Sequence, residues 1–152
     1  MDVYAVWRML SLRRYRGRLS YRESGDEPMV NIKDSLPNTW KTIENDFICL
    51  WACKTTHASF DIMSSPHSAF DDGYFQIIII RKGGRADLLK MFLNMENGGH
   101  ADMDAVEIIK CKAFRLEPLN ASGGNLSLDG EEIGYGLVQG SIDANGYKLL
   151  GA

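Results

Sequence analysis

The chain has 152 residues, a formal net charge of −3 and 45% hydrophobic residues, the profile of one ordinary globular domain. This weakly acidic balance argues against a nucleic-acid-binding protein. No apolar run approaches the roughly 20 residues that a membrane-spanning helix needs, and the N-terminus lacks the shape of a signal peptide, which predicts a cytosolic protein.

The first 14 residues predict an amphipathic helix. Its apolar residues recur with helical spacing at Val3, Val6, Trp7 and Leu10. Six arginines lie between Arg8 and Arg22 with no acidic residue among them, which favours an anionic surface or partner. A basic amphipathic helix with a tryptophan is typical of contacts with a membrane surface or a calmodulin-type protein, although packing in a core is the alternative.

Strand patterns dominate the rest of the chain. An alternating strand at 18–23 precedes a polar connector with two prolines, which we expect to be flexible over residues 24–45. Buried strands are expected at 46–55 and 74–80, because both segments are rich in β-branched, aromatic and apolar residues.

A second helix is predicted at 85–96, where Gly98 and Gly99 end it. Short strands with glycine turns follow at 105–118, 125–129, 133–142 and 146–151. Since strands do not alternate with helices, the sequence predicts an antiparallel β-sandwich with a leading amphipathic helix and one further helix packed against it.

The pair Asp129-Gly130 separates two alternating apolar segments, which is a strong signal for a hairpin with a two-residue turn. Two glutamates, Glu131 and Glu132, follow directly. The acidic cluster is either a solvated turn or a corner that meets a ligand or another domain.

No complete catalytic or metal site emerges from spacing alone. Cys49, Cys53 and His57 are spaced by four, but four residues along a strand cover about 13 Å, too far for one ion. Cys49, Cys53 and Cys111 are an odd number of cysteines, which predicts free thiols. Ser24-Gly25-Asp26-Glu27 resembles part of a phosphate loop but lacks the following helix and the Gly-Lys-Ser/Thr ending.

The helix at 85–96 carries one apolar stripe, made of Leu88, Met91, Phe92 and Met95. Such a stripe is either plain core or, because methionine fills irregular spaces, an adaptable surface that suits an acyl chain.

Several segments, in order, resemble the C-terminal domain of sphingosine kinases, which belong to the diacylglycerol-kinase-like lipid kinases. The most specific are "KAFRLEP" (112–118) and "LDGEEI" followed by "VQGSI" (128–142), and "DFICLWACKTTHASFDIMSSP" (46–66) and "LLKMFLNMENGGH" (88–100) support them. The resemblance covers nearly the whole chain apart from the connector. It implies a single β-sandwich domain over residues 1–152 whose helix lines a lipid cleft.

The resemblance also implies site residues. The lipid-lining positions of the family correspond to Trp51, Ile62, Leu88, Met91, Phe92, Met95, His100 and Val106, with Ala58, Ser64 and Ile77 or Ile78 as further matches. The family's "DGE" turn, which contacts the nucleotide, corresponds to Asp129, Gly130 and Glu131. The bulky pair on the family's lipid-entry helix corresponds to Val6 and Trp7.

The implied function is the lipid-binding part of an ATP-dependent sphingosine kinase that makes sphingosine 1-phosphate. No catalytic residue is assigned, because the family's Gly-rich loop and catalytic Asp have no counterpart in this sequence. ATP and Mg²⁺ would act only together with such a nucleotide-binding domain, so we expect the chain alone to be inactive.

Expected partners are a sphingoid base, an anionic membrane reached peripherally from the cytoplasm, and a calmodulin-like protein. The alternatives are a non-catalytic lipid- or partner-binding module, and a fragment of a ceramide or diacylglycerol kinase.

Overall fold

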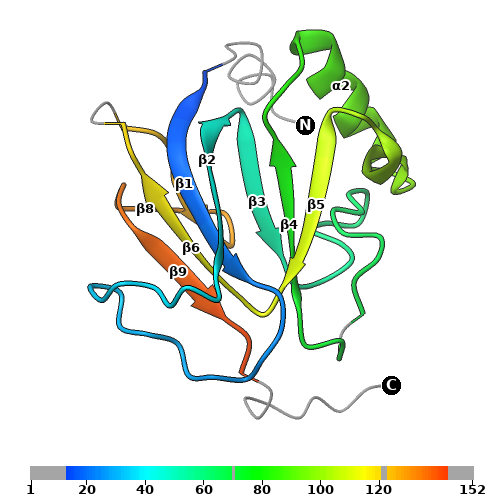
Figure 1. Cartoon of the computed structure of the whole chain (residues 1–152). Coiled ribbons are helices and arrows are strands. Elements are labelled where there is room, and N and C mark those ends of the chain that lie inside the picture. Colours follow the sequence, from blue (N-terminus) through cyan, green and yellow to red (C-terminus); the bar gives the residue numbers. More distant parts are fainter. Residues whose placement is uncertain (1–12, 70, 121–122, 144–152) are drawn as a thin grey trace.

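The computed structural model describes residues 13–69, 71–120 and 123–143 (Figure 1). The helix predicted at 2–14 and the strand predicted at 146–151 therefore lie outside the described residues, except for Arg13 and Arg14. The described elements are β1 (Tyr15–Arg22), β2 (Lys41–Phe47), β3 (Cys49–Cys53), β4 (Phe75–Ile80), α2 (Arg85–Asn94), the short 3-10 helix η1 (Gly99–Asp102), β5 (Val106–Cys111), β6 (Ala113–Pro118), β7 (Leu126–Leu128), β8 (Glu131–Ile133) and β9 (Val138–Ser141).

The strands form two antiparallel sheets and a separate hairpin. One sheet has the order β2-β1-β6-β9, the second has the order β3-β4-β5, and β7 pairs with β8. Figure 1 shows α2 beside the upper end of the three-stranded sheet, on the side away from the four-stranded one. The predicted mainly β, antiparallel fold is confirmed.

Two tight corners carry the chain from one sheet to the other. Only Ile48 separates β2 from β3, and only Lys112 separates β5 from β6. The amide of Ile48 donates to the carbonyl of Ile80 (2.8 Å) and that of Lys112 to the carbonyl of Arg22 (2.8 Å), which holds each corner in place. The sequence predicted one unbroken strand at 46–55 and another at 105–118, and both predictions were wrong because a corner interrupts each segment. An apolar pattern that continues through a corner does not reveal the bend.

The strand β4 contributes to two hydrophobic cores. Ile77 and Ile79 pack between the sheets with Leu19 of β1 and Phe114 of β6. Ile80 points the other way, into a core shared with α2. Both faces of the strand are therefore covered. This explains why four consecutive residues are isoleucines and why each is at most 2% exposed.

The connector is partly built into the fold. Strand β2 begins at Lys41, inside the segment 24–45 that was predicted to be connector, because residues 41–47 pair with β1 along its length. Residues 30–34 are fastened to the outer face of the four-stranded sheet by two side chains, Arg115 of β6 and Gln139 of β9, which we call the clamp.

The clamp makes four hydrogen bonds. The Nε of Arg115 donates to Oε1 of Gln139 (3.0 Å), its facing residue in the β6–β9 register. The guanidinium also donates to the carbonyls of Asp34 (2.7 Å) and Asn31 (2.9 Å). Gln139 Nε2 donates to the carbonyl of Val30 (3.0 Å). Arg115 is a buried residue, 7% exposed, and these contacts provide its guanidinium with acceptors.

Candidate functional site

The helix α2 is fixed at both ends by glycines and their neighbours. At its start, Oδ2 of Asp87 accepts a hydrogen bond from the amide of Gly84 (2.7 Å). Beyond its end, Gly98 has φ 78, and a Cβ there would lie 2.9 Å from Sδ of Met63 and 3.0 Å from Cβ of Pro66. The glycine stop predicted from the sequence is confirmed, because only a residue without a side chain fits both the backbone conformation and the space.

The inner face of α2 packs on the three-stranded sheet. Leu88, Met91 and Met95 are buried against Ile80. The partly buried residues around them are Ile48, Cys49, Trp51, Ile62, Phe92, Met103 and Val106. Seven of the eight predicted lipid-lining residues therefore lie in one apolar cluster, and the eighth, His100, is fully buried in η1.

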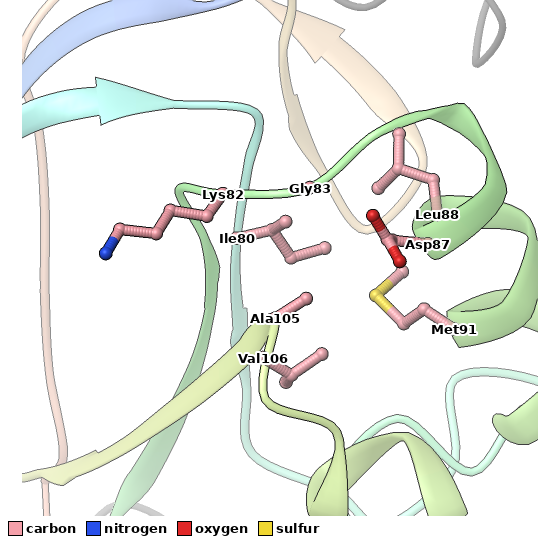
Figure 2. Close-up of a pocket in the computed structure, with 8 residues that line it drawn as sticks. All are labelled: Ile80, Lys82, Gly83, Asp87, Leu88, Met91, Ala105 and Val106. Atoms are coloured by element: carbon pink, nitrogen blue, oxygen red, sulfur yellow. The ribbon is translucent and has the colours of Figure 1, made fainter.

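A narrow recess opens between the start of α2 and the ends of β4 and β5 (Figure 2). It is too narrow to hold a water molecule. Its lining residues are Ile80, Lys82, Gly83, Asp87, Leu88, Met91, Ala105 and Val106. Figure 2 shows Leu88 and Met91 facing Ile80 and Val106 across this gap. An acyl chain would fit here only if α2 moved away from the sheet.

A group of buried polar residues lies further along the same face of the sheet. The ring of His100 is fully buried, and its Nε2 donates to the carbonyl of Ser64 (2.9 Å). Ser64 also shares a side-chain hydrogen bond with the thiol of Cys53. Cys53 faces Gln76 directly in the β3–β4 register, so the strand pairing places Gln76 next to this series of contacts. We call these four residues the polar cluster.

The cysteines are free, as the sequence predicted, and are poorly suited to chemistry. Burial raises the pKa of Cys49 to about 11 and that of Cys111 to about 12. Both therefore stay protonated at neutral pH, whereas the thiolate is the form that attacks substrates or binds metals. Among the described residues, no three His, Cys, Asp or Glu side chains converge in a way that could hold a metal ion.

The acidic hairpin has the predicted turn. Leu128 faces Glu131 across the β7–β8 pair, so Asp129 and Gly130 form a two-residue loop. Their φ angles are 50 and 89, both positive, as this turn requires. Asp129 and Glu131 are exposed, and neither forms an ion pair with a described residue. The hairpin therefore presents carboxylate acceptors to the surroundings.

Two arginines of β1 are neutralised by glutamates of the four-stranded sheet. Arg16 and Arg18 contact Glu44 at 3.0 and 3.1 Å, and Arg18 also contacts Glu117 at 2.8 Å. Hydrogen bonds from the two arginines hold the pKa of Glu44 below its usual value. The predicted membrane or partner contacts Val3, Val6, Trp7 and Leu10 lie outside the described residues.

The segment that resembles a phosphate loop is held by ion pairs. Arg22 contacts Glu27 at 2.5 Å, and Lys112 pairs with Asp26. Gly25, with φ 88, allows the sharp turn between them. The loop thus directs its carboxylates at nearby cations, an arrangement unsuited to binding a phosphate.

Comparison with protein families decides the family of this fold. A family described as "YegS C-terminal NAD kinase beta sandwich-like domain" matches residues 38–146. The chain belongs to that family. As a YegS C-terminal domain, it is part of the diacylglycerol-kinase-like lipid kinases that the sequence motifs indicated.

Curated relatives of this YegS C-terminal domain carry sphingosine kinase names. Human sphingosine kinase 2 is 39% identical over 110 residues, which cover 70% of this chain and 17% of that protein. Mouse sphingosine kinase 1 is 30% identical over 164 residues, covering 94% of this chain and 43% of that protein. The chain thus spans less than half the length of these relatives.

Solved structures show the same fold at low sequence identity. A crystal structure described as a diacylglycerol kinase from Bacillus anthracis has a TM-score of 0.56 and 12% identity, covering 93% of this chain and 44% of that one.

Within the described residues, no helix is long and apolar enough to cross a membrane.

Sequence reasoning missed two features of this YegS C-terminal domain. The motifs "FRLEP" and "VQGSI" indicated the family, but they did not reveal that Arg115 of the first motif and Gln139 of the second meet in the clamp. Gln76 was passed over as part of an apolar strand, although a lone amide beside four isoleucines was a visible signal.

Proposed function

We propose that this domain is the lipid-binding part of an ATP-dependent sphingoid-base kinase that makes sphingosine 1-phosphate, and that it has no kinase activity alone. The observation that carries the proposal is the apolar cluster beneath α2, which gathers the residues that the motifs marked as lipid-lining. Membership of a lipid kinase family and similarity to proteins named sphingosine kinases support it.

The cluster is suited to an acyl chain if α2 can shift. Met91, Met95 and Met103 supply unbranched side chains that can repack around a flexible chain. Each methylene that enters would contribute about 0.8 kcal/mol, so a long chain can offset the loss of contacts between helix and sheet. The recess at the start of α2 is the natural place for such a chain to enter.

The hairpin is the proposed contact with the nucleotide. ATP would supply the phosphoryl group that is transferred to the lipid hydroxyl. The exposed carboxylates of Asp129 and Glu131 fit a role as acceptors for ribose hydroxyls or for water on Mg²⁺, because no described residue forms an ion pair with them. They do not by themselves form a metal site.

We further propose that the protein works in the cytoplasm at anionic membranes. The exposed Arg13 and Arg14 adjoin the predicted amphipathic helix with Val3, Val6, Trp7 and Leu10. Basic and apolar residues side by side favour a membrane surface, and the same pattern suits a calmodulin-like partner.

A second candidate function is a non-catalytic lipid-binding module. It is favoured by the apolar character of the cluster under α2, where the one partly buried cysteine stays protonated and supplies no reactive group. A ceramide or diacylglycerol kinase differs from the leading proposal only in the lipid.

Titrating the domain with sphingosine, ceramide and diacylglycerol shows which of these lipids it binds. Joining the domain to a nucleotide-binding domain and measuring lipid phosphorylation distinguishes a kinase from a non-catalytic module.

Replacement of Phe92 tests the proposed lipid site. Phe92 is half-buried at the edge of the cluster, so Phe92→Ala is expected to weaken binding of a fluorescent sphingoid base about tenfold while the domain stays folded. Leu93→Ala, on the exposed side of the same helix, is the control and should leave binding unchanged. If Phe92→Ala lowers the free energy of unfolding by about 3–5 kcal/mol and the folded fraction binds normally, Phe92 is plain core.

A further inference from the structure

The polar cluster contains two buried side-chain atoms that have no hydrogen-bond partner among the described residues. They are Oε1 of Gln76, a residue only 2% exposed, and Nδ1 of His100, which is fully buried. Buried polar atoms in folded proteins are nearly always hydrogen-bonded, so two exceptions in one cluster require an explanation.

Both atoms are acceptors. The oxygen of an amide can only accept a hydrogen bond. Nε2 of His100 faces a backbone carbonyl and must donate to it, so the neutral ring leaves Nδ1 as an acceptor as well. The group that would satisfy either atom is therefore a hydrogen-bond donor such as a hydroxyl.

The cluster lies at the far end of a row of buried isoleucines on β4, Ile80 and Ile78, which we call the track. The recess opens beside Ile80, at one end of β4, and Gln76 lies four residues away at the other end. Side chains alternate along a strand, so Gln76, Ile78 and Ile80 share the face that meets α2, over about 13 Å. An apolar chain that entered beside Ile80 would pass Ile78 and then meet Gln76.

We infer that Gln76 and His100 form a polar end to this track, which limits the length of an apolar chain and accepts a chain that carries a hydroxyl at its far end. This inference rests on the proposed function, because it concerns the depth of the same lipid site. A methylene that reached the cluster would close both acceptors off from water without a donor, whereas a terminal hydroxyl would donate to one of them.

The test uses the whole chain and a fluorescent sphingoid base displaced by unlabelled bases of increasing length. For the wild-type chain, affinity should rise with length and then fall about tenfold once the tail reaches the cluster. At that length, a base with a terminal hydroxyl should bind better than its plain counterpart.

The variant Gln76→Met keeps the shape of the side chain and removes the acceptor. It should shift the preferred length upward and weaken the advantage of the terminal hydroxyl. Asn38→Leu, which removes an exposed amide in the connector, is the matched control and should leave the length profile unchanged. Should Gln76→Met fail to fold, His100→Phe removes the second acceptor and tests the same point.

The outcomes are distinguishable. If no base of any length binds the wild-type chain, the proposed lipid function fails. If bases bind but the length profile and the hydroxyl preference are the same in wild type and in both variants, the polar end is refuted while the lipid site remains.

Discussion

Asp72 illustrates how single charged residues are held at the end of the three-stranded sheet. Its carboxylate contacts Nζ of Lys54 at 3.0 Å and Nζ of Lys110 at 3.6 Å, and it accepts a hydrogen bond from the amide of Tyr74 at 3.0 Å. Burial opposes its ionisation, but Lys54 and the amides of Tyr74 and Ala69 outweigh that effect, so the pKa of Asp72 lies below its usual value.

This lowered pKa predicts a pH-dependent contribution to stability. Because the folded protein holds Asp72 ionised, the contribution is complete above the unfolded-state pKa of about 3.8 and disappears as the pH falls through the lower folded-state pKa. At neutral pH, Asp72→Asn should lower the free energy of unfolding by about 1 kcal/mol. Urea unfolding at neutral pH and below the folded-state pKa checks this, with the exposed Asp71→Asn as control. An equal loss at both pH values would contradict it.

Arg115 is the residue whose replacement should release the connector. Arg115→Met keeps the apolar stem but leaves the carbonyls of Asn31 and Asp34 without their donor. We expect a loss of about 1–3 kcal/mol in the free energy of unfolding and faster cleavage by trypsin after Lys33, an exposed residue inside the fastened segment.

The control for Arg115 is Arg18→Met on the same sheet. Arg18 is much more exposed and forms surface ion pairs, so its loss should change stability by less than about 1 kcal/mol. It should also leave cleavage after Lys33 unchanged. Equal trypsin sensitivity of both variants would show that the clamp does not hold the connector.

At the scale of elements, the sequence predicted what local patterns encode. Gly98 and Gly99 after an apolar stripe indicated the end of α2, and Asp129-Gly130 indicated the hairpin, because both depend on neighbouring residues. The corners at Ile48 and Lys112 were missed because the direction of a bend depends on which distant strands pair. The clamp was missed for the same reason, since Arg115 and Gln139 meet only in the register of β6 with β9.

The end of α2 provides a prediction about an element. Gly98→Ala places a methyl group against Met63 and Pro66 in a left-handed conformation, which should lower the free energy of unfolding by about 1–3 kcal/mol. Gly134→Ala is the control, because a Cβ added there would meet nothing within 4 Å and its φ is not positive. Thermal unfolding followed by circular dichroism measures both. Equal melting temperatures of the two variants would mean that the backbone after α2 adapts freely.

At the scale of the whole molecule, two surface features of the domain lie apart from each other. It carries an apolar cluster on one sheet and a hairpin with exposed carboxylates on another part of the surface, and its relatives are more than twice as long. This separation fits the proposed function, in which a nucleotide-binding domain acts together with this one, and the activity of the isolated chain tests that proposal.

We expect the isolated chain to make no sphingosine phosphate from Mg-ATP and sphingosine. In a full-length kinase that contains this domain, Glu131→Ala should raise the apparent KM for ATP by roughly ten- to a hundred-fold, the value of one lost charged hydrogen bond, with the KM for the lipid nearly constant. Glu132→Ala, on the next residue of the hairpin, is the control. An unchanged ATP dependence would make the hairpin a simple solvated turn, and turnover by the isolated chain would overturn the first expectation.

The four isoleucines of β4 have a consequence for how the chain is made. An uncharged segment with such high β-propensity, "FQIIII", is a hazard for aggregation whenever it is exposed. On a ribosome it emerges before α2 and β5, the elements that later cover and pair with it. Arg81 and Lys82 follow directly and act as charged gatekeepers against self-association. Yield in a cell should therefore depend on chaperones that hold the chain until α2 and β5 have been synthesised.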